Sequence, residues 1–310
     1  MAESSVLHGS QSGFRAGFVA ILGLPNVGKS TLLNAFLGER LSIVTAKAQT
    51  TQRRLLGICS GPSFQAVFVD TPGLLDPRDP LQRSMRAEAL STLDDADVVL
   101  AVVDAGFRPS IDWVEGFRTP AGRPALLCLN KVDRIPAVEA ERLVEGWSRG
   151  GGWAGVHRTI AHRGDGVEAL LHAIVDFLPE SPPLFPEDDL SDVPVRDLVG
   201  EMIRETCLEE LSDEVPYAVA VRVEQFREPA GNEPTYIEAL LYVERESQKG
   251  IVIGAGGRTI RKIGTRSREK VERFLEQRVF LELRVKVLAN WRRKPNHLRL
   301  LGFRIPAEET

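Results

Sequence analysis

A phosphate-binding loop is the clearest chemical signal in the sequence. Residues 23–30 follow the pattern G-x-x-x-x-G-K-S between an apolar run at 18–22 and a helix expected at 30–37. Its glycines let backbone N–H groups curl around phosphates, and the helix N-terminus adds a positive dipole. We expect Lys29 to reach the β- and γ-phosphates and Ser30 to ligate Mg²⁺. The predicted phosphate site comprises Gly23, Leu24, Pro25, Asn26, Val27, Gly28, Lys29, Ser30 and Thr31.

A second motif places an acid after the apolar run 66–69. Its residues are Asp70, Thr71, Pro72 and Gly73. At the end of a strand, Asp70 can hold Mg²⁺ through water, while the Gly73 N–H meets the γ-phosphate. Asp-x-Pro-Gly by itself would favour a β-turn. Its position after the phosphate loop favours a nucleotide site.

A third motif selects the base. The residues Asn130, Lys131, Val132 and Asp133 follow a buried run at 125–129. Asp133 can accept from the ring N1–H and the exocyclic amine of guanine, a donor pair that adenine lacks. We expect Asn130 to brace the loops and Lys131 to lie along the base. N-K-x-D alone is a common surface turn, but three motifs in this order predict binding of GTP or GDP with Mg²⁺ and hydrolysis of GTP.

The position after Gly73 predicts slow hydrolysis. Regulatory GTPases with a glutamine there use it to orient the attacking water. Here the residue is Leu74, whose apolar side chain cannot orient water. We expect other groups or a partner to complete the site.

These motifs need a parallel sheet whose strand ends meet at one edge. The runs at 18–22, 67–69, 98–103 and 125–129 are apolar on both faces, as in a sheet covered by helices. We therefore predict a doubly wound, mostly parallel α/β domain over residues 16–179, after a loose tail at 1–15.

The composition changes after residue 179. The segment 180–194 is rich in proline and acids without periodicity, which indicates a linker. A second domain at 195–290 is predicted as α+β with an antiparallel sheet. Its expected elements are a helix at 195–210, strands at 217–225 and 235–244, a turn, a long basic helix and a strand at 279–287.

Charge is distributed unevenly along the chain. The net charge is −4, yet residues 249–304 carry 16 Lys and Arg against four Glu, a local charge of +12. A basic block on an acidic protein favours a polyanionic partner, although a solvated helix face explains the charge equally well.

A glycine pair inside this block indicates nucleic-acid binding. Gly254, Ala255, Gly256 and Gly257 form G-x-x-G after an apolar run and before a basic helix with Arg258, Arg261 and Lys262. This resembles a KH domain of the bacterial type II form, whose glycine loop clamps about four nucleotides of single strand. A turn between helices is the alternative. In the basic tail at 291–310, Trp291 is predicted either to stack on a base or to pack on the domain.

The three cysteines lie far apart without a C-x-x-C pair, which suggests neither a disulfide framework nor a zinc site and fits a reducing cytoplasm. The first residues lack the apolar region of a signal peptide, and no apolar run reaches the ~18 residues that span a bilayer.

The three nucleotide motifs resemble the translation-factor-like branch of P-loop GTPases. The resemblance implies that a threonine of the first switch closes on Mg²⁺; Thr51 is favoured and Thr50 is the alternate. It also places the Ala161 amide near the guanine oxygen, with Ile160 replacing the usual serine. In a resembling subgroup, an asparagine at the position of Asn26 helps to hold an activating K⁺; a loop asparagine chosen for its turn is the alternative.

Together, a GTPase domain, a linker and a terminal KH domain resemble the Era family over residues 16–304. The resemblance implies a monomeric cytoplasmic protein that binds small-subunit (16S-type) ribosomal RNA during ribosome assembly under control of GTP, with possible peripheral membrane contact. Gln52 departs from the arginine usual after the switch threonines. Two alternatives stay open: a membrane-associated signalling GTPase, and an RNA-binding adaptor with a structural nucleotide.

Overall fold

The computed structural model describes residues 13–45, 47, 51–52, 54–73, 77, 79–107, 122–150, 152–229, 231 and 233–305. The chain divides into two compact units. The first unit contains Met1–Ser42, Arg54–Leu74 and Ala89–Asp192, and the second contains Ile43–Arg53, Leu75–Glu88 and Val193–Thr310. Two short segments from the N-terminal half of the chain thus belong with the C-terminal unit. The predicted Leu74 and Thr50 lie outside the described residues.

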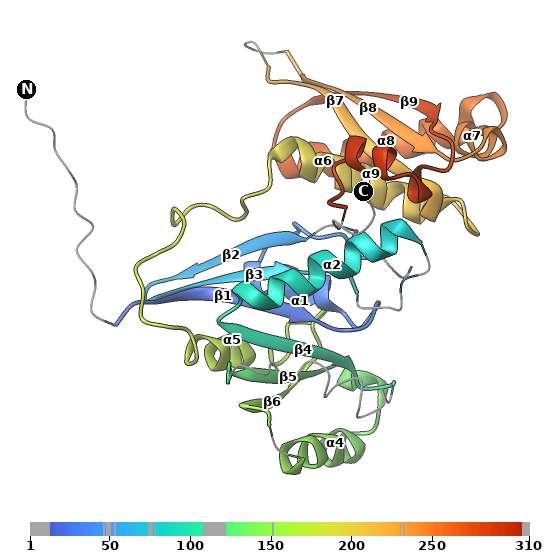
Figure 1. Ribbon diagram of the computed structural model, residues 1–310. Helices are drawn as coiled ribbons and strands as arrows, with labels where there is room; N and C mark the ends of the chain where they lie inside the picture. Colours follow the sequence, from blue (N-terminus) through green and yellow to red (C-terminus); the bar gives the residue numbers. More distant parts are fainter. Residues whose placement is uncertain are drawn as a thin grey trace, which may run out of the picture. The chain divides into compact units, whose positions relative to one another are not determined.

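The first unit is built on a six-stranded sheet with the order β2-β3-β1-β4-β5-β6 (Figure 1). All neighbouring strands are parallel except β2 and β3, which form an antiparallel pair. The predicted fold, a mostly parallel doubly wound sheet, is therefore confirmed. The strands are β1 (Arg15–Leu22), β2 (Leu55–Gly61), β3 (Phe64–Asp70), β4 (Val98–Asp104), β5 (Ala125–Asn130) and β6 (Gly155–Thr159).

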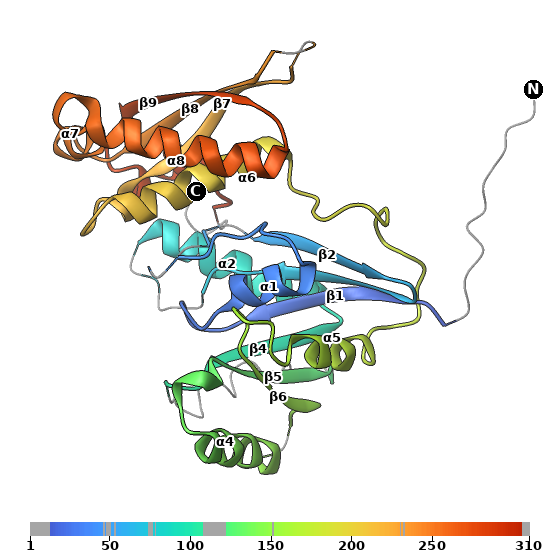
Figure 2. The same cartoon turned by 180° about the vertical axis from the view of Figure 1, so that it is seen from behind.

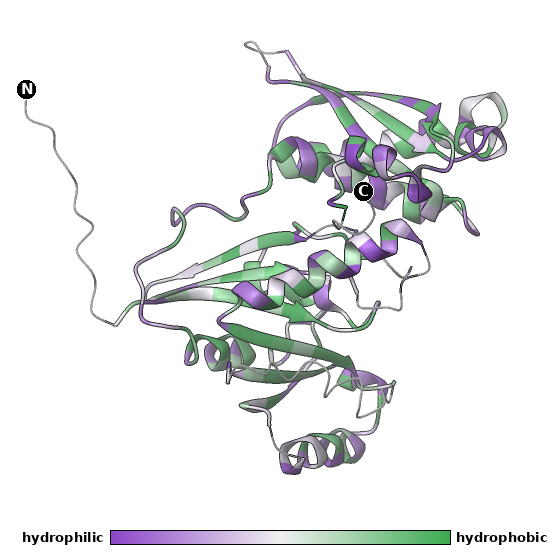
Figure 3. Ribbon diagram, in the orientation of Figure 1, coloured by the Kyte–Doolittle hydropathy of each residue, from purple (hydrophilic) through white to green (hydrophobic). Residues whose placement is uncertain are grey.

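Helices cover both faces of this sheet (Figure 2). On one face, α1 and α5 enclose the largest apolar core, in which Phe36 stacks on Phe68. On the other face, α4 and the C-terminal part of α2 form two smaller clusters. Because both faces are covered, the central strands are apolar throughout, as the hydropathy colouring shows (Figure 3). The helices are α1 (Lys29–Leu37), α2 (Pro80–Asp95), α4 (Ala137–Arg149) and α5 (Val167–Val175).

The predicted linker at 180–194 packs along the edge of the sheet formed by β2 and β3. The Ile58 N–H donates to the carbonyl of Leu190 at 2.9 Å. The side chain of the buried Gln65 accepts from the N–H groups of Leu184 and Phe185 and donates to the Phe185 carbonyl. These bonds tie the segment to the first unit up to Asp192.

The second unit is an α+β domain around a three-stranded sheet with the order β7-β8-β9. Strands β7 and β8 are antiparallel, but β8 and β9 are parallel, so the prediction of an antiparallel sheet was wrong for this pair. Strands β8 and β9 run in the same direction because the chain between them crosses over through two helices, whereas antiparallel neighbours can be joined by a short hairpin. The elements are α6 (Val195–Glu210), β7 (Ala220–Arg227), β8 (Thr235–Val243), α7 (Glu246–Ile253), α8 (Arg258–Leu275), β9 (Val279–Val287) and α9 (Pro295–Leu300).

One face of this small sheet packs against α6 and α8 (Figure 2), where alternate apolar residues of the strands form the core with both helices. The opposite face is partly covered by the chain after β9, through a cluster that includes Tyr242, Trp291 and Phe303. Among the described residues, no helix has the length and apolar character needed to cross a membrane.

Candidate functional site

The predicted phosphate loop connects β1 to α1. Gly28 caps the helix with φ of 103°, and a Cβ there would lie 2.2 Å from Nδ2 of Asn130. A side chain at this position would therefore be strained and would collide with the third motif. The glycine lets the loop and the Asn130 motif approach each other closely.

Lys29 lies inside the loop and is held by it. Its ammonium donates to the carbonyls of Gly23 at 3.1 Å and Leu24 at 3.0 Å. Burial lowers the pKa of Lys29 to about 8, and the charge of Asp70 only partly opposes this shift. No carboxylate among the described residues bonds directly to this buried cation, which is therefore suited to bind phosphate oxygens.

Ser30 and Asp70, two of the three predicted metal ligands, lie in direct hydrogen-bond contact. The Ser30 hydroxyl donates to Oδ2 of Asp70 at 2.7 Å, and the Ser42 hydroxyl donates to the same atom at 2.8 Å. Asp70 is completely buried at the end of β3. A hydroxyl and a buried carboxylate are hard oxygen donors, so Ser30 and Asp70 fit Mg²⁺, while the Ser42 hydroxyl holds the carboxylate in place. Sequence analysis missed Ser42, which is positioned by backbone bonds to the side chain of Asn34.

The D-T-P-G loop lies directly against the phosphate loop. The Thr71 hydroxyl donates to the Ile21 carbonyl of β1 at 2.8 Å. A Cβ on Gly73 would lie 2.7 Å from the backbone nitrogen of Pro25, so only glycine permits this approach. The structure thus brings the first two motifs together at the end of the parallel strands.

Asn130 is the central brace of the base-binding motif. Its Nδ2 donates to the Val27 carbonyl at 2.9 Å. Its Oδ1 accepts from the Thr159 hydroxyl at 3.0 Å and from the Ala161 N–H at 3.1 Å. One side chain that is 1% exposed therefore connects three loops. The Ala161 amide predicted to support guanine is placed beside this motif.

Lys131 and Asp133 follow the buried strand β5 and lie closer to the surface. Lys131 has φ of 60°, and its ammonium donates to Oδ2 of Asp104 at 2.8 Å and to the Asn26 carbonyl. Asp133 is exposed in a single-turn helix, where its carboxylate is accessible to a base. Sequence analysis missed Asp104, although its position at the carboxyl end of β4 is the signal that could have found it.

The predicted switch residue Thr51 is half-buried and belongs to the segment 43–53 of the second unit. Two other residues of this segment contact α6. The Val44 N–H donates to Oε1 of Glu205 at 3.2 Å, and the Lys47 ammonium donates to the carbonyls of Leu208 and Leu211. Sequence analysis missed Lys47, because nothing local links it to residues more than 150 positions later.

The predicted RNA-binding loop lies between α7 and α8. Gly254 has φ of 72°, and a Cβ there would lie 2.2 Å from the Thr259 hydroxyl. The side chains of Arg258 and Arg261 bend back to loop carbonyls, at 3.3 Å from Ala255 and 3.2 Å from Gly257. The two arginines and the open glycine backbone therefore lie at one helix end, where phosphates can be bound.

Several cations of the basic block are neutralised within the second unit. Burial by itself would raise the pKa of Glu210. Hydrogen bonds from Lys262 and Arg266 of α8 lower this pKa overall and keep the carboxylate ionised. The basic charge of the sequence thus overstates the free cation surface of α8. The pairs between α8 and α6 are Lys262–Glu210, Arg266–Glu210, Lys270–Glu205 and Lys270–Glu209.

The prediction that Trp291 stacks on a base was wrong. Trp291 is 0% exposed, and its indole N–H donates to the Ala218 carbonyl at 2.8 Å. Its ring also stacks against Phe303, with centroids 6.2 Å apart. Trp291 therefore packs on the domain, which was the alternative, because the chain after β9 folds back over the sheet.

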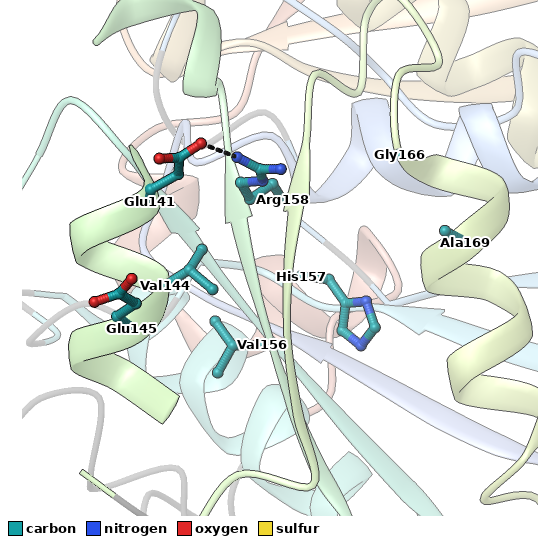
Figure 4. Close-up of a pocket in the computed structure, with 8 residues that line it drawn as sticks. All are labelled: Glu141, Val144, Glu145, Val156, His157, Arg158, Gly166 and Ala169. Atoms are coloured by element: carbon teal, nitrogen blue, oxygen red, sulfur yellow. Dashed lines mark ion pairs between the residues drawn. The ribbon is translucent and has the colours of Figure 1, made fainter. Parts of the chain in front are cut away.

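A shallow pocket on the first unit is separate from these motifs. It has a volume of about 450 Å³ and lies around β6, between α4 and α5. In Figure 4, Val144 and Val156 face each other on one side of the strand, while His157 points to the other side. None of the predicted site residues lines this pocket.

Comparisons with known proteins agree with this geometry. A family model described as a 50S ribosome-binding GTPase matches residues 18–131, and one described as a KH domain matches residues 214–292. The chain is 42% identical over 290 residues to GTPase Era of Lacticaseibacillus paracasei, which covers 93% of this chain and 96% of the relative. It is 38% identical over 292 residues to GTPase Era of Carboxydothermus hydrogenoformans, with 94% and 98% covered.

Two solved structures resemble the whole chain. One is a crystal structure of a variant of Aquifex aeolicus Era bound to GDP and AlF4⁻, with a TM-score of 0.89, 37% identity, and 93% of this chain and 99% of that chain covered. The other is Era in complex with MgGDPNP and nucleotides 1506–1542 of 16S ribosomal RNA, with a TM-score of 0.88, 38% identity and the same coverage. The resemblance drawn from the motifs is confirmed: this chain belongs to the Era family of GTPases, with a P-loop GTPase domain followed by a KH domain.

Proposed function

We propose that this GTPase binds the 3′ region of small-subunit ribosomal RNA through its KH domain during ribosome assembly, and that its GTP or GDP state controls this binding. The observation that carries the proposal is the division of the chain into units. The segments 43–53 and 75–88, which follow Ser42 and Gly73 of the nucleotide site, both belong to the unit that contains the KH domain. Changes at the nucleotide therefore have two covalent routes to the RNA-binding unit.

The first route ends on α6. This helix has no basic residue in its last turn, so Lys47 supplies the cation that stabilises the negative end of its dipole. Glu205 accepts from the Val44 N–H through one oxygen and from Lys270 of α8 through the other. The segment with the predicted switch threonine is therefore bonded directly to α6 and is linked to α8 only through the Glu205 carboxylate.

The second route ends on the C-terminal chain. Leu81 and Met85 of α2 pack in the same apolar cluster as Trp291 and Leu298, and the Ser84 hydroxyl donates to the Arg304 carbonyl. A shift of α2 would disturb this cluster, because packed apolar side chains do not deform continuously.

The nucleotide site supports hydrolysis of GTP to GDP and phosphate. A magnesium ion held by Ser30 and Asp70 would neutralise charge that develops on the β- and γ-phosphate oxygens. Lys29 would add positive charge at the same oxygens, and the Gly73 N–H would orient the γ-phosphate. The residue after Gly73 is Leu74, whose apolar side chain cannot orient the attacking water. The intrinsic rate of GTP hydrolysis is therefore slow, and it rises when RNA or the ribosome completes the site.

We also propose activation by K⁺ at the phosphate loop. Asn26 is exposed with φ of 63°, and its carbonyl accepts from Lys131, so its side chain lies at the open side of the loop. GTPase rates in K⁺ and Na⁺ at equal ionic strength test this proposal: equal rates would remove it.

The relative solved with MgGDPNP and 16S nucleotides 1506–1542 supports the choice of RNA. The test measures the affinity of the protein, loaded with GDP or a non-hydrolysable GTP analogue, for an RNA of the small-subunit 3′ region. We expect the two affinities to differ by at least about tenfold, and Gly256→Asp/Gly257→Asp to abolish tight binding because the new carboxylates repel phosphates.

Gly231→Asp is the matched control, because Gly231 shares the left-handed φ and open surroundings of Gly256. We expect Gly231→Asp to bind RNA like the parent. Equal affinity in both nucleotide states would favour an adaptor with a structural nucleotide. Binding to anionic vesicles in place of RNA would favour a membrane-associated GTPase.

A further inference from the structure

The outer face of the KH sheet carries an ordered row of three side chains, one from each strand. The backbone register aligns Arg227 of β7 with Tyr236 of β8, and Tyr236 with Phe280 of β9. The Arg227 guanidinium lies 4.3 Å from the centroid of the Tyr236 ring. The rings of Tyr236 and Phe280 are stacked, with centroids 5.8 Å apart and an interplanar angle of 12°. We call these three residues the aromatic row.

A β-bulge creates this alignment. The register between β7 and β8 shifts between Val223 and Gln225, so one additional residue enters β7. Val223 and Phe226 both contact the core, and Arg227 therefore points to the outer face. Without the bulge, alternation along the strand would turn Arg227 toward the helices. The side chain that polarises the Tyr236 ring is thus positioned by an irregular strand.

The row is held in place from one side and open on the other. The Tyr236 hydroxyl donates to Oε2 of Glu282 at 2.9 Å, and Arg284 donates to Oε1 of the same carboxylate at 2.7 Å. The hydrogen bond to Glu282 raises the pKa of Tyr236, so the hydroxyl stays a donor at neutral pH. Phe280 at the other end of the stack is 56% exposed.

The described part of the chain after β9, up to residue 305, does not cover this end of the sheet. Its buried residues contact Ala220, Leu240 and Tyr242, which lie at the opposite end of the same outer face. Residues that continue the strands from the row are polar, namely Gln225, Glu238 and Glu282. Among the described residues at this end of the sheet, the strongly exposed apolar surface is the Phe280 ring, which is too small for a protein partner that depends on buried apolar area.

We propose that the aromatic row is a second RNA contact on which one unpaired base stacks, against the exposed face or edge of Phe280. Stacking needs a single ring, and every base offers a π-face. The cations that match RNA phosphates lie along the same strand: Arg278 and Lys286 are exposed, and Glu282 and Glu238 are already paired with Arg284. This contact lies on the sheet face opposite α8, so it is distinct from the G-x-x-G loop, and it rests on the proposed RNA binding.

The first test compares RNA lengths. Phe280→Ala and Phe280→Leu are measured against single-stranded RNAs of about four and about twelve nucleotides, because the glycine loop accounts for about four. We expect both variants to bind the longer RNA about tenfold more weakly and the shorter one unchanged. Leu300→Ala, which removes an equally exposed apolar side chain elsewhere in the unit, serves as the control. An unchanged affinity of Phe280→Ala for the longer RNA would overturn the proposal.

The second test separates stacking from charge. The longer RNA is prepared with abasic positions outside the four nucleotides at the loop, which keeps its phosphates but removes bases. We expect this change to weaken binding to the parent protein about tenfold and to leave Phe280→Ala unaffected. Equal weakening of both proteins would contradict the assignment to Phe280.

The same experiments separate this inference from the proposed function. If Gly256→Asp/Gly257→Asp and the parent bind RNA equally poorly, RNA binding itself fails. If the parent binds RNA tightly, the Gly256→Asp/Gly257→Asp variant binds weakly and the Phe280 variants bind like the parent, the aromatic row alone is rejected. Urea unfolding checks the fold of each variant, and we expect small changes because Phe280 is more than half exposed.

Discussion

The hydroxyl of Ser30 donates a 2.7 Å hydrogen bond to Oδ2 of Asp70, across 40 residues of sequence. Ser30 lies in the first turn of α1, which follows β1, and Asp70 ends the neighbouring parallel strand β3. The same carboxylate oxygen also accepts from Ser42, at 2.8 Å. This pair of serines allows the metal ligand to be separated from a residue that only holds the carboxylate.

Ser30→Ala should raise the Mg²⁺ concentration needed for half-maximal GTP hydrolysis by about 10- to 100-fold, because it removes a predicted metal ligand. Ser42→Ala removes a hydrogen bond to the same oxygen and should change this requirement by less than about threefold. Steady-state hydrolysis over a Mg²⁺ titration measures both. Equal effects of the two substitutions would mean that Ser30 acts only on the position of Asp70.

Asp133→Asn should exchange the preference for guanine for a preference for xanthine. The amide has a single acceptor oxygen, so it cannot accept from both the guanine N1–H and the amine, but its N–H can donate to the oxygen that xanthine carries in place of the amine. We expect affinity for GDP to fall by at least about 100-fold. Competition binding with GDP and XDP measures the change, and Glu168→Gln, an exposed acid of α5, is the matched control. A variant that still prefers GDP would refute the role of Asp133.

Asn130→Ala should destabilise the first unit by about 2–4 kcal/mol, because it removes hydrogen bonds to three buried partners, one in the phosphate loop and two at the end of β6. Thr159→Val removes only one of these bonds and should cost about 1 kcal/mol. Urea unfolding of the nucleotide-free protein gives both free energies. A smaller loss for Asn130→Ala than for Thr159→Val would show that the brace is not the main contact between the loops.

Lys29 should make stability depend on pH above neutrality. Its pKa is about 8 in the folded protein and 10.5 in the unfolded chain, so the unfolded chain binds more protons between these values. The contribution of Lys29 to the free energy of unfolding therefore rises with pH between about 8 and 10.5, by at most about 3 kcal/mol.

The measurement compares parent and Lys29→Met, both without nucleotide, by urea unfolding at several pH values. We expect Lys29→Met to be the more stable protein at pH 7, since it removes a buried charge, and the advantage to shrink toward pH 10. Lys249→Met, at a partly exposed lysine of α7 that pairs with Glu246, should show no such trend. A pH-independent difference between parent and Lys29→Met would contradict the lowered pKa.

Lys47→Met should weaken the link between nucleotide state and RNA affinity. The substitution keeps the length of the side chain but removes the cation that caps α6, at a cost in stability of about 0.5–1 kcal/mol. We expect the ratio of RNA affinities in the GTP-analogue and GDP states to fall by at least about threefold, with Lys249→Met unchanged. A ratio identical to that of the parent would show that the segment 43–53 does not transmit the signal through α6.

Local patterns were sufficient to predict the three nucleotide motifs and the strands that carry them. The predicted runs at 18–22, 98–103 and 125–129 lie within β1, β4 and β5. Such strands are recognisable because a sheet covered on both faces needs apolar residues throughout. Gly28 and Gly254 were likewise predictable, since a left-handed φ and close contacts leave only glycine. The strands β2 and β6 at the sheet edges lacked such a continuous apolar signal and were not predicted.

Long-range contacts could not be predicted in the same way. Trp291 is equally compatible with a stacked base and a buried core, and only the return of the chain over the sheet decides between them. The cations of α8 indicated a free basic surface until the acids of α6 were found beside them. The bulge in β7 likewise decides which way Arg227 faces.

The guanine nucleotide site and the G-x-x-G loop are each encoded in a few consecutive residues with a defined backbone, so the residues alone are enough to predict both. Three other contacts follow only from the folded chain: Lys47 caps α6, Glu205 joins Val44 to Lys270, and Tyr236 stacks between Arg227 and Phe280. These contacts join residues far apart in the chain, and their energy exists only once packing has brought the partners together.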